Sequence, residues 1–262
     1  MERGNPEAQA HPSFGGVLRH QAAIREKLSK IRNKIGVYSA KGGVGKTTVA
    51  VNLAFALQRN GYRVGLLDAD IDCPNLPMFL GLEGRMQSET LPLKPLEKDG
   101  VKVASTAMLV DDAKSPIIWR GPLIAKMLYD FLGSTDWGEL DYLIVDLPPG
   151  TSDSPLTVMQ VANLDGFIIV TTPQRIAGVN SMRAGLMAKR LSAHVFGVVE
   201  NMSQGGPSPS TEEVSKALGA EIMGRVPADR RMADLSDSGK VPVLELAEMA
   251  KVFDDIAGKL PK

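Results

Sequence analysis

The feature that most constrains this 262-residue chain is a glycine-rich loop between an apolar run and a helical pattern. The run Ile35–Ser39 leads into A-K-G-G-V-G-K-T-T at 40–48, and residues 47–58 have helical spacing. Glycines let the main chain approach a phosphate and turn its N–H groups inward, and the start of a helix adds a positive dipole end. The loop therefore predicts a site for a nucleoside triphosphate.

The side chains and amides of this loop have distinct expected roles. The amides that would cradle the phosphates belong to Gly42, Gly43, Val44 and Gly45. Lys46 is expected to reach the β- and γ-phosphates, Thr47 to offer its hydroxyl to Mg²⁺, and Thr48 to contact the α-phosphate. Ala40 stands where the general pattern has glycine, so the turn must start with a negative φ.

Short apolar runs alternate with helical patterns from Lys34 onward. The expected strands are Ile35–Ser39, Val64–Asp68, Val101–Ser105, Tyr142–Asp146, Phe167–Thr171, Val195–Val199 and Ile222–Val226. The expected helices are Thr47–Gln58, Leu123–Phe131, Pro155–Ala162, Ser181–Leu191 and Thr211–Leu218, and Gly205–Ser210 is expected to be a loop. This alternation predicts an α/β fold with a doubly wound, mostly parallel sheet and helices on both faces.

The first 33 residues differ from the remainder of the chain. Residues 1–16 show no period, whereas Val17–Asn33 has helical spacing and an excess of basic side chains. We therefore expect a flexible segment and a basic helix at 1–33, followed by one nucleotide-binding domain at 34–262. The helix either packs on the domain through one apolar stripe or serves as an arm that docks on a partner or a membrane.

Composition excludes several classes of protein. Thirty basic and thirty acidic residues give no net charge, so the sequence carries no strong signal for nucleic-acid binding. Cys73 is the only cysteine, which excludes an intrachain disulfide and any multi-cysteine metal site built by one chain. No apolar run is long enough to span a membrane, and no signal peptide is evident, so a cytoplasmic location is expected.

Carboxylates follow two of the expected strands. Asp68, Asp70 and Asp72 alternate at the end of one strand, so an extended chain would place them on the same side. Asp146 ends another strand and is expected to hold Mg²⁺ through water. The Leu147–Thr151 turn after it contains Gly150, which is placed to sense a γ-phosphate, and Thr151, which is placed to transmit its loss.

The sequence K-G-G-V-G-K-T, with its extra lysine at Lys41, resembles the deviant phosphate loop of the Mrp/ApbC, nitrogenase iron protein, MinD and ParA family. The resemblance implies a P-loop NTPase that binds ATP and Mg²⁺ and hydrolyses ATP. We expect the hydrolysis to be slow, because a switch benefits from a long-lived ATP state. It implies that Lys41 reaches the nucleotide of the partner in a homodimer. Asp70 would orient the attacking water and join Thr47 and Asp146 around Mg²⁺, while Asp68 would position metal-bound water or nearby backbone. Lys41, Lys46, Asp70 and Asp146 are thus the expected catalytic residues.

Several further segments are similar to the Mrp/ApbC iron–sulfur carrier branch. They are Asp70–Pro77, Leu80–Gly84, Trp119–Pro122, Asp136–Leu143, Leu147–Thr151, Thr172–Gln174, Val198–Ser203 and Gly239–Pro242. The resemblance implies that Asn201 bonds the adenine edge and that the loop with Pro227 and Asp229 covers the base. It also implies a role in iron–sulfur cluster assembly, with a cysteine-bearing paralogue or an iron–sulfur apo-protein as partner.

One departure from that branch concerns the cluster itself. Relatives carry C-x-x-C after the N-M-S segment, whereas this chain has Gln204–Ser210 without cysteine. Because thiolates hold [4Fe–4S] clusters, the sequence predicts no cluster site of that kind.

The alternative function is that of a MinD/ParA-like positioning ATPase acting on membrane, DNA or a protein partner. A third possible function is that of a phosphotransferase or ligase of related fold. The apolar stripe at Leu246–Leu260 has an acidic opposite face, which favours packing on the domain over binding to lipid.

Overall fold

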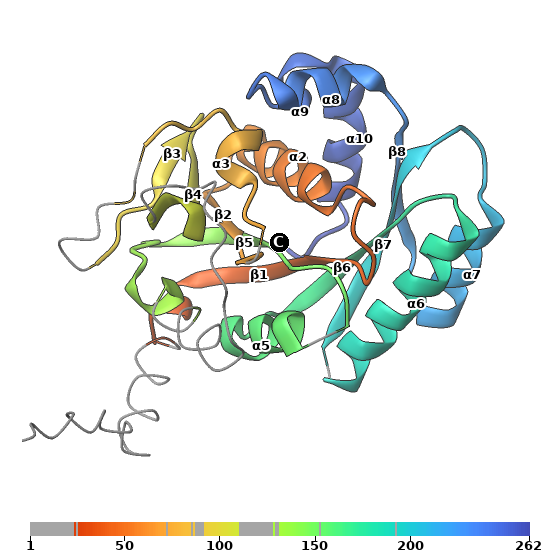
Figure 1. Ribbon diagram of the computed structural model, residues 1–262, viewed down its shortest axis with the longest axis horizontal. Coiled ribbons are helices and arrows are strands. Elements are labelled where there is room, and N and C mark those ends of the chain that lie inside the picture. Colours follow the sequence, from red (N-terminus) through yellow and green to blue (C-terminus); the bar gives the residue numbers. More distant parts are fainter. Residues whose placement is uncertain are drawn as a thin grey trace, which may run out of the picture.

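An eight-stranded sheet forms the centre of the computed structural model (Figure 1). The structure describes residues 24, 26–71, 73–84, 86, 92–109, 128, 131–151, 153–191 and 193–262. The strands are β1 (Ile31–Tyr38), β2 (Val64–Asp68), β3 (Leu96–Lys98), β4 (Val101–Ser105), β5 (Leu140–Asp146), β6 (Gly166–Thr171), β7 (His194–Ser203) and β8 (Ile222–Pro227). Their order in the sheet is β3-β4-β2-β5-β1-β6-β7-β8, and only β3 runs antiparallel to its neighbour.

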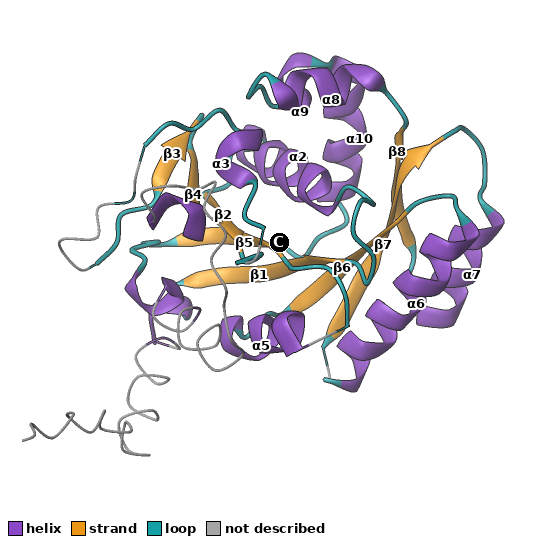
Figure 2. Cartoon of the chain, viewed as in Figure 1, coloured by secondary structure: helices purple, strands orange, loops and turns teal. Residues whose placement is uncertain are grey.

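Helices cover both faces of this sheet. They are α2 (Lys46–Arg59), α3 (Leu76–Phe79), α5 (Asp153–Ala162), α6 (Arg175–Arg190), α7 (Pro209–Leu218), α8 (Arg230–Asp237), α9 (Pro242–Glu245) and α10 (Ala247–Ala257), with a 3₁₀ turn at Thr106–Leu109. In Figure 2, α2, α3 and α8–α10 lie on one side of the strands, and α5, α6 and α7 lie on the other. The expected doubly wound α/β architecture is therefore confirmed.

The central strands are buried along their whole length. β2 and β6 have no exposed residue, and β5 has only Asp141 partly exposed. Continuous Val, Ile and Leu runs suit this position because helices exclude water from both faces of each strand. The carboxyl ends of β1, β2, β5 and β7 consequently meet at one edge, where loops carry polar side chains.

Several predicted boundaries shift in the structure. The helix predicted to run to Asn33 is wrong at its end, because residues 31–33 already pair with β5 as part of β1. The helix predicted at 181–191 begins at Arg175, and α7 begins at Pro209, inside the predicted 205–210 loop. Of the predicted helix at 123–131, only Leu128 and Phe131 are described, and both are helical. The predicted domain boundary between residues 33 and 34 stays a prediction.

The antiparallel strand β3 was missed by the sequence analysis. It pairs with β4 through a tight turn at Asp99 and Gly100, both of which have positive φ. An Asp-Gly pair between two short extended runs is a strong hairpin signal, because both central residues of such a turn need φ above zero. β3 is only three residues long, which is too short to show a recognisable strand pattern in the sequence.

Both ends of the described chain pack on the domain. Ile24 and Leu28, the described part of the N-terminal apolar stripe, are buried, and the Lys27 ammonium donates to the Gly133 carbonyl. At the other end, Met249, Phe253 and Ile256 of α10 are buried, as the acidic outer face predicts. Within the described part of the chain, no helix combines the length and apolarity needed to cross a membrane.

Candidate functional site

The phosphate loop connects β1 to α2 and is open to solvent at its tip. Gly43 and Gly45 have φ of 78° and 83°, which residues with a Cβ rarely adopt. A Cβ built on Gly42 or Gly43 would meet nothing within 4 Å, so space for a ligand remains above the main chain. α2 begins directly at Lys46 and points its N-terminus at this space. The predicted loop residues 42–48 thus form one continuous surface of the kind that suits an anion.

Asn201 holds the loop from the end of β7. Its Nδ2 donates to the Val44 carbonyl at 2.9 Å, and the Asn201 side chain is buried. A Cβ on Gly45 would come within 2.1 Å of this Nδ2, so only glycine fits there. A residue expected to contact the base therefore also fixes the backbone that faces the phosphates.

Thr47 and Asp146 meet at the first turn of α2. The Thr47 hydroxyl donates to Asp146 Oδ2 at 2.6 Å, while Asp146 Oδ1 is buried without a hydrogen-bond partner. A hydroxyl beside a carboxylate with an unused oxygen is a donor set that suits Mg²⁺, which takes oxygen ligands and keeps several waters. Lys46 is also buried, and its charge acts on Asp146. The residues present therefore fit a Mg·nucleotide.

Asp68 lies beside Asp146, since the two residues are register partners on β2 and β5. It is 2% exposed, and burial raises its pKa to about 8, with a further contribution from the charge of Asp146. Burial likewise raises the pKa of Asp146 to about 6, although the hydrogen bond from Thr47 opposes this. Two buried carboxyls that resist ionisation together favour a cation between or beside them.

The hydrogen bonds of Asp68 also show what it positions. One oxygen accepts from the Leu76 N–H and the Ser105 hydroxyl, both at 3.1 Å, and the other accepts from the Asp70 N–H at 3.2 Å. Asp68 therefore shapes the backbone that carries Asp70. This arrangement fits the expectation that Asp68 positions the switch backbone.

The segment after β2 contains the remaining predicted acids. Asp70 Oδ1 accepts from the Cys73 N–H at 3.2 Å, and the Cys73 side chain is exposed. Asp72 lies outside the described residues, as does the Trp119–Pro122 segment. The roles assigned to Asp70 in water activation and metal binding stay predictions.

Lys41 lies at the start of the phosphate loop and is half-buried. Its backbone is fixed by Ser39, whose hydroxyl pairs with both the N–H and the carbonyl of Lys41 at 3.2 Å. The Lys41 ammonium takes part in none of the ion pairs between described residues.

The turn after β5 is tied to the start of the phosphate loop. The Tyr38 hydroxyl donates to the Gly150 carbonyl at 2.5 Å, and the Gly150 N–H donates to the Ser39 carbonyl at 3.4 Å. Gly150 has φ of 98°, a conformation that few other residues adopt. The turn that contains Gly150 and Thr151 is therefore hydrogen-bonded to residues 38 and 39, and its role as a phosphate sensor stays a prediction.

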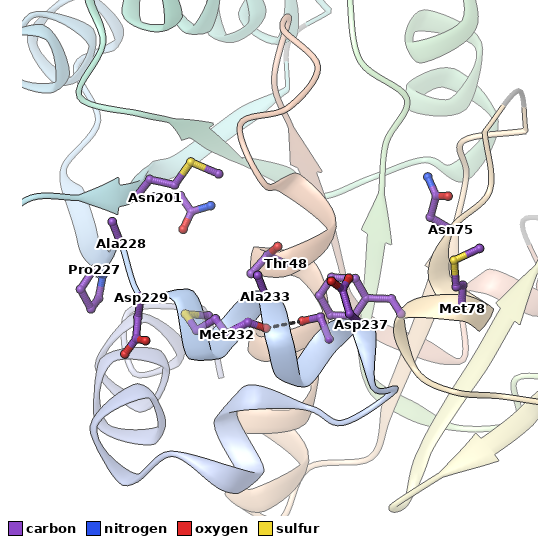
Figure 3. A pocket seen from close by; sticks show the side chains of 13 residues that line it. Thr48, Asn75, Met78, Asn201, Pro227, Ala228, Asp229, Met232, Ala233 and Asp237 are labelled. Carbon is purple, nitrogen blue, oxygen red and sulfur yellow. Dashed lines mark hydrogen bonds between the residues drawn. The ribbon is translucent and has the colours of Figure 1, made fainter.

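A cavity of about 450 Å³ opens beside Thr48 and contains the predicted base-binding residues (Figure 3). Asn201, Pro227 and Asp229 line it, together with Asn75, Met78, Phe79, Met202, Ala228, Met232, Ala233, Ser236 and Asp237. Figure 3 shows Asn201, Pro227 and Asp229 toward one side and Asn75 and Met78 toward the other. Thioether and phenyl walls with two side-chain amides suit a flat heterocycle. The walls from α3 and α8 were missed, because these short helices carry little pattern of their own.

A buried carboxylate next to Asn201 was also missed. Glu200 is 0% exposed; it accepts from the Ser203 hydroxyl at 2.7 Å and from the Thr211 hydroxyl, and Arg225 lies 3.8 Å away. These partners come from β7, α7 and β8. In the sequence, Glu200 directly follows the apolar residues Val198 and Val199. An acid within an apolar run is the signal that could have indicated this buried carboxylate.

The described residues do not fit an iron–sulfur cluster. They include no group of three or more His, Cys, Asp or Glu side chains able to hold a metal ion. Cys73 is the only cysteine of the chain, so one subunit offers a single thiolate. Two such thiolates would have to come from two copies of the chain.

Comparisons with known proteins agree with this geometry. The chain is 40% identical over 274 residues to an iron–sulfur cluster carrier protein of Methanocaldococcus jannaschii, covering 97% of this chain and 93% of the relative. A solved nucleotide-binding protein from Archaeoglobus fulgidus, in complex with ADP, is 38% identical with a TM-score of 0.73, covering 84% of this chain and 92% of that one. MinD from Pyrococcus horikoshii shares the fold at 22% identity and a TM-score of 0.68, covering 88% and 97% of the two chains.

The ParA family, described as NUBPL iron-transfer P-loop NTPases, matches residues 30–261. This range contains the phosphate loop, both buried acids and the cavity beside Thr48. The chain therefore belongs to the NUBPL iron-transfer P-loop NTPase family.

Proposed function

We propose that this protein is a Mg²⁺-dependent ATPase that acts as a homodimeric switch in iron–sulfur cluster transfer. The observation that carries the ATPase part is the Thr47–Asp146 pair, with an unused buried oxygen on Asp146 below an open cradle of amides. Thr47 and Asp146 would hold Mg²⁺, which would neutralise charge on the phosphates. The cluster part rests on the family and on the name of the Methanocaldococcus jannaschii relative.

Different residues of the chain serve nucleotide binding and hydrolysis. Lys46 and the amides of residues 42–48 hold the phosphates, while Asn201, Pro227 and Asp229 surround the base. Asp70 orients the attacking water, and Lys41 of the second subunit stabilises charge that builds on the γ-phosphate. Because Lys41 completes the site only after two subunits close, turnover is slow and coupled to dimer formation.

The chain itself lacks the cysteine pair that would hold a [4Fe–4S] cluster between two subunits. We therefore propose that it serves a cysteine-bearing paralogue or an iron–sulfur apo-protein rather than holding that cluster itself. A MinD-like membrane role is disfavoured, because the apolar side chains of α10 are used inside the domain.

The variant Lys41→Ala tests the dimeric switch. It should keep ATP affinity within about threefold but lower hydrolysis by about a hundredfold or more, because a transition-state charge contact is lost. Lys46→Ala should lose affinity as well, and Lys251→Ala, at an exposed lysine on α10, should change neither. Fluorescent-nucleotide titration and phosphate release at several protein concentrations measure both quantities. Equal loss of affinity and hydrolysis in Lys41→Ala would contradict a role in trans.

Anaerobic reconstitution tests the cluster role separately. Alone, the protein should bind no stoichiometric iron; mixed with a cysteine-bearing paralogue and Mg·ATP, it should accelerate transfer of a cluster to an apo-protein. Iron analysis and visible absorption follow both steps. Unchanged transfer with an active ATPase would reject the cluster role and leave the ATPase assignment intact.

A further inference from the structure

Helix α6 has a charge unlike that of the protein as a whole. Its 16 residues contain Arg175, Arg183, Lys189 and Arg190 and no acid, whereas the complete chain balances thirty basic against thirty acidic residues. Neither the phosphate site nor the base cavity uses any residue of this helix. The local excess of positive charge therefore lacks an explanation in the nucleotide site.

The inner face of α6 is fully used in packing. Gly178 lies against Ser210 and Gly185 against Leu218, so close that a Cβ at either position would collide with α7. Small residues on this face allow the close approach, and they are Ala177, Gly178, Ser181, Ala184, Gly185 and Ala188. α6 is thus fixed in orientation, and its opposite face must point to solvent.

The outer face of α6 carries a stripe with apolar and basic members. Exposed residues recur every three or four positions along it: Ile176, Val179, Arg183, Leu186 and Arg190. Ile176 is 70% exposed, Leu186 47% and Val179 39%, which places three of the seven large exposed hydrophobic side chains of the described chain on one helix. A surface hollow of about 390 Å³ lies here, lined by Arg175, Ile176, Val179, Asn180 and Arg183.

Charge limits what can cover this stripe. A second copy docked through the same face would bring Arg183 toward its own counterpart, and like charges in contact are unfavourable. Residues 1–33 carry six basic side chains against three acidic ones and have the wrong sign as well. A phosphate backbone would match the arginines but would leave Ile176 and Leu186 facing a polar, hydrated surface.

We infer that the α6 stripe is a docking site for an acidic amphipathic helix of a partner protein. Apolar side chains of that helix would fill the hollow around Ile176 and Val179, and its flanking carboxylates would pair with Arg175, Arg183 and Arg190. From Ile176 to Arg190 the stripe is about 21 Å long at 1.5 Å per residue, which corresponds to about four turns of the partner. This surface is separate from the ATPase assignment and does not depend on it.

The test uses the full chain and two labelled synthetic peptides. Both peptides have leucine at the same helical spacing; one has glutamate and the other lysine at the flanking positions. Fluorescence anisotropy measures binding, and hydrogen exchange locates it. The glutamate peptide should saturate the protein, protect α6 and weaken with salt, whereas the lysine peptide should not bind.

Matched variants identify the residues responsible. Arg183→Glu and Ile176→Ser should each weaken the glutamate peptide by about tenfold or more, because one removes a charge partner and the other an apolar anchor. Lys251→Glu on α10 and Leu244→Ser on α9 carry the same changes at other exposed positions and should leave binding within about twofold. All four sites are exposed, so circular dichroism should remain that of the parent protein.

Three results would overturn the inference. The first is equal binding of both peptides or equal loss in all four variants. The second is tighter, Arg183-dependent binding of duplex DNA or of phosphatidylglycerol vesicles. The third is a change in oligomeric state of Arg183→Glu without any peptide binding, which would assign the stripe to a second copy. A photo-crosslinking residue placed at Val179 tests the same surface directly in cells. Crosslinked partner segments rich in acidic and apolar residues support the inference, and basic segments reject it.

Discussion

At the scale of single residues, the contact between Gly45 and Asn201 decides whether the phosphate loop keeps its shape. Gly45→Ala adds a methyl group within 2.1 Å of Asn201 Nδ2 and places alanine at φ of 83°. Gly61→Ala is the matched control, because Gly61 has φ of 87° and open space around it. Both variants should lose about 1–2 kcal/mol of stability from backbone strain. Only Gly45→Ala should also weaken nucleotide binding, by about tenfold or more, in a fluorescent-nucleotide titration. Equal affinities in the two variants would contradict the contact.

Asp68 and Asp146 make a second residue-scale prediction, concerning pH. Their pKa values of about 8 and about 6 exceed the unfolded value of 3.8, so the folded protein binds more protons than the unfolded chain between these limits. The free energy of unfolding of the nucleotide-free protein should therefore fall as pH rises from about 4 to about 8. Asp68→Asn should flatten that slope in thermal melts, since the amide does not ionise. A parent slope that is flat or rises over this range would reject the prediction.

At the scale of elements, Glu200 links β7, α7 and β8. Glu200→Ala leaves the hydroxyls of Ser203 and Thr211 without their acceptor, and each buried unsatisfied group costs about 1–3 kcal/mol. Glu212→Gln changes the exposed partner of the same Arg225 and should cost less than about 1 kcal/mol. Urea unfolding measures both. Similar losses in the two variants would mean that the buried network adds nothing to stability.

The elements also show how much of the structure the sequence predicts. β2 and β4 have the predicted bounds, because continuous apolar runs between turns carry a strong local signal. The phosphate loop follows from the same pattern, whereas the pairing of Asp68 with Asp146 depends on the strand order, which was not predicted. β3, α3 and α8 do not, because three- to eight-residue segments are stabilised by contacts that are distant in sequence. The base cavity depends on these short elements, so its three predicted side chains were found without most of its walls.

At the scale of the whole molecule, the packing of the last helix, α10, distinguishes this protein from a MinD-like ATPase that binds membranes through such a helix. Phe253 and Ile256 of α10 pack on the domain, and Ile256 occupies the space that a Cβ on Gly224 would take. Phe253→Ala should therefore lower the free energy of unfolding by about 3–5 kcal/mol, whereas the exposed neighbour Lys251→Ala should change it by less than about 0.5 kcal/mol. The parent protein should not sediment with anionic vesicles in the presence of ATP. ATP-dependent sedimentation would contradict the buried position of this helix.

Lys98 on β3 connects two parts of the molecule that are far apart in sequence. Its ammonium donates to the Leu80 carbonyl and, at 2.7 Å, to the Gly239 carbonyl, where the backbones of Gly81 and Gly239 touch. These two segments directly follow α3 and α8, and both helices contribute residues to the cavity walls. A single positive charge therefore joins the carboxyl-terminal ends of two helices that both carry cavity-lining residues. Acetylation of this amine would remove that charge and weaken the link between the ends of α3 and α8, while every side chain that lines the cavity stays unmodified.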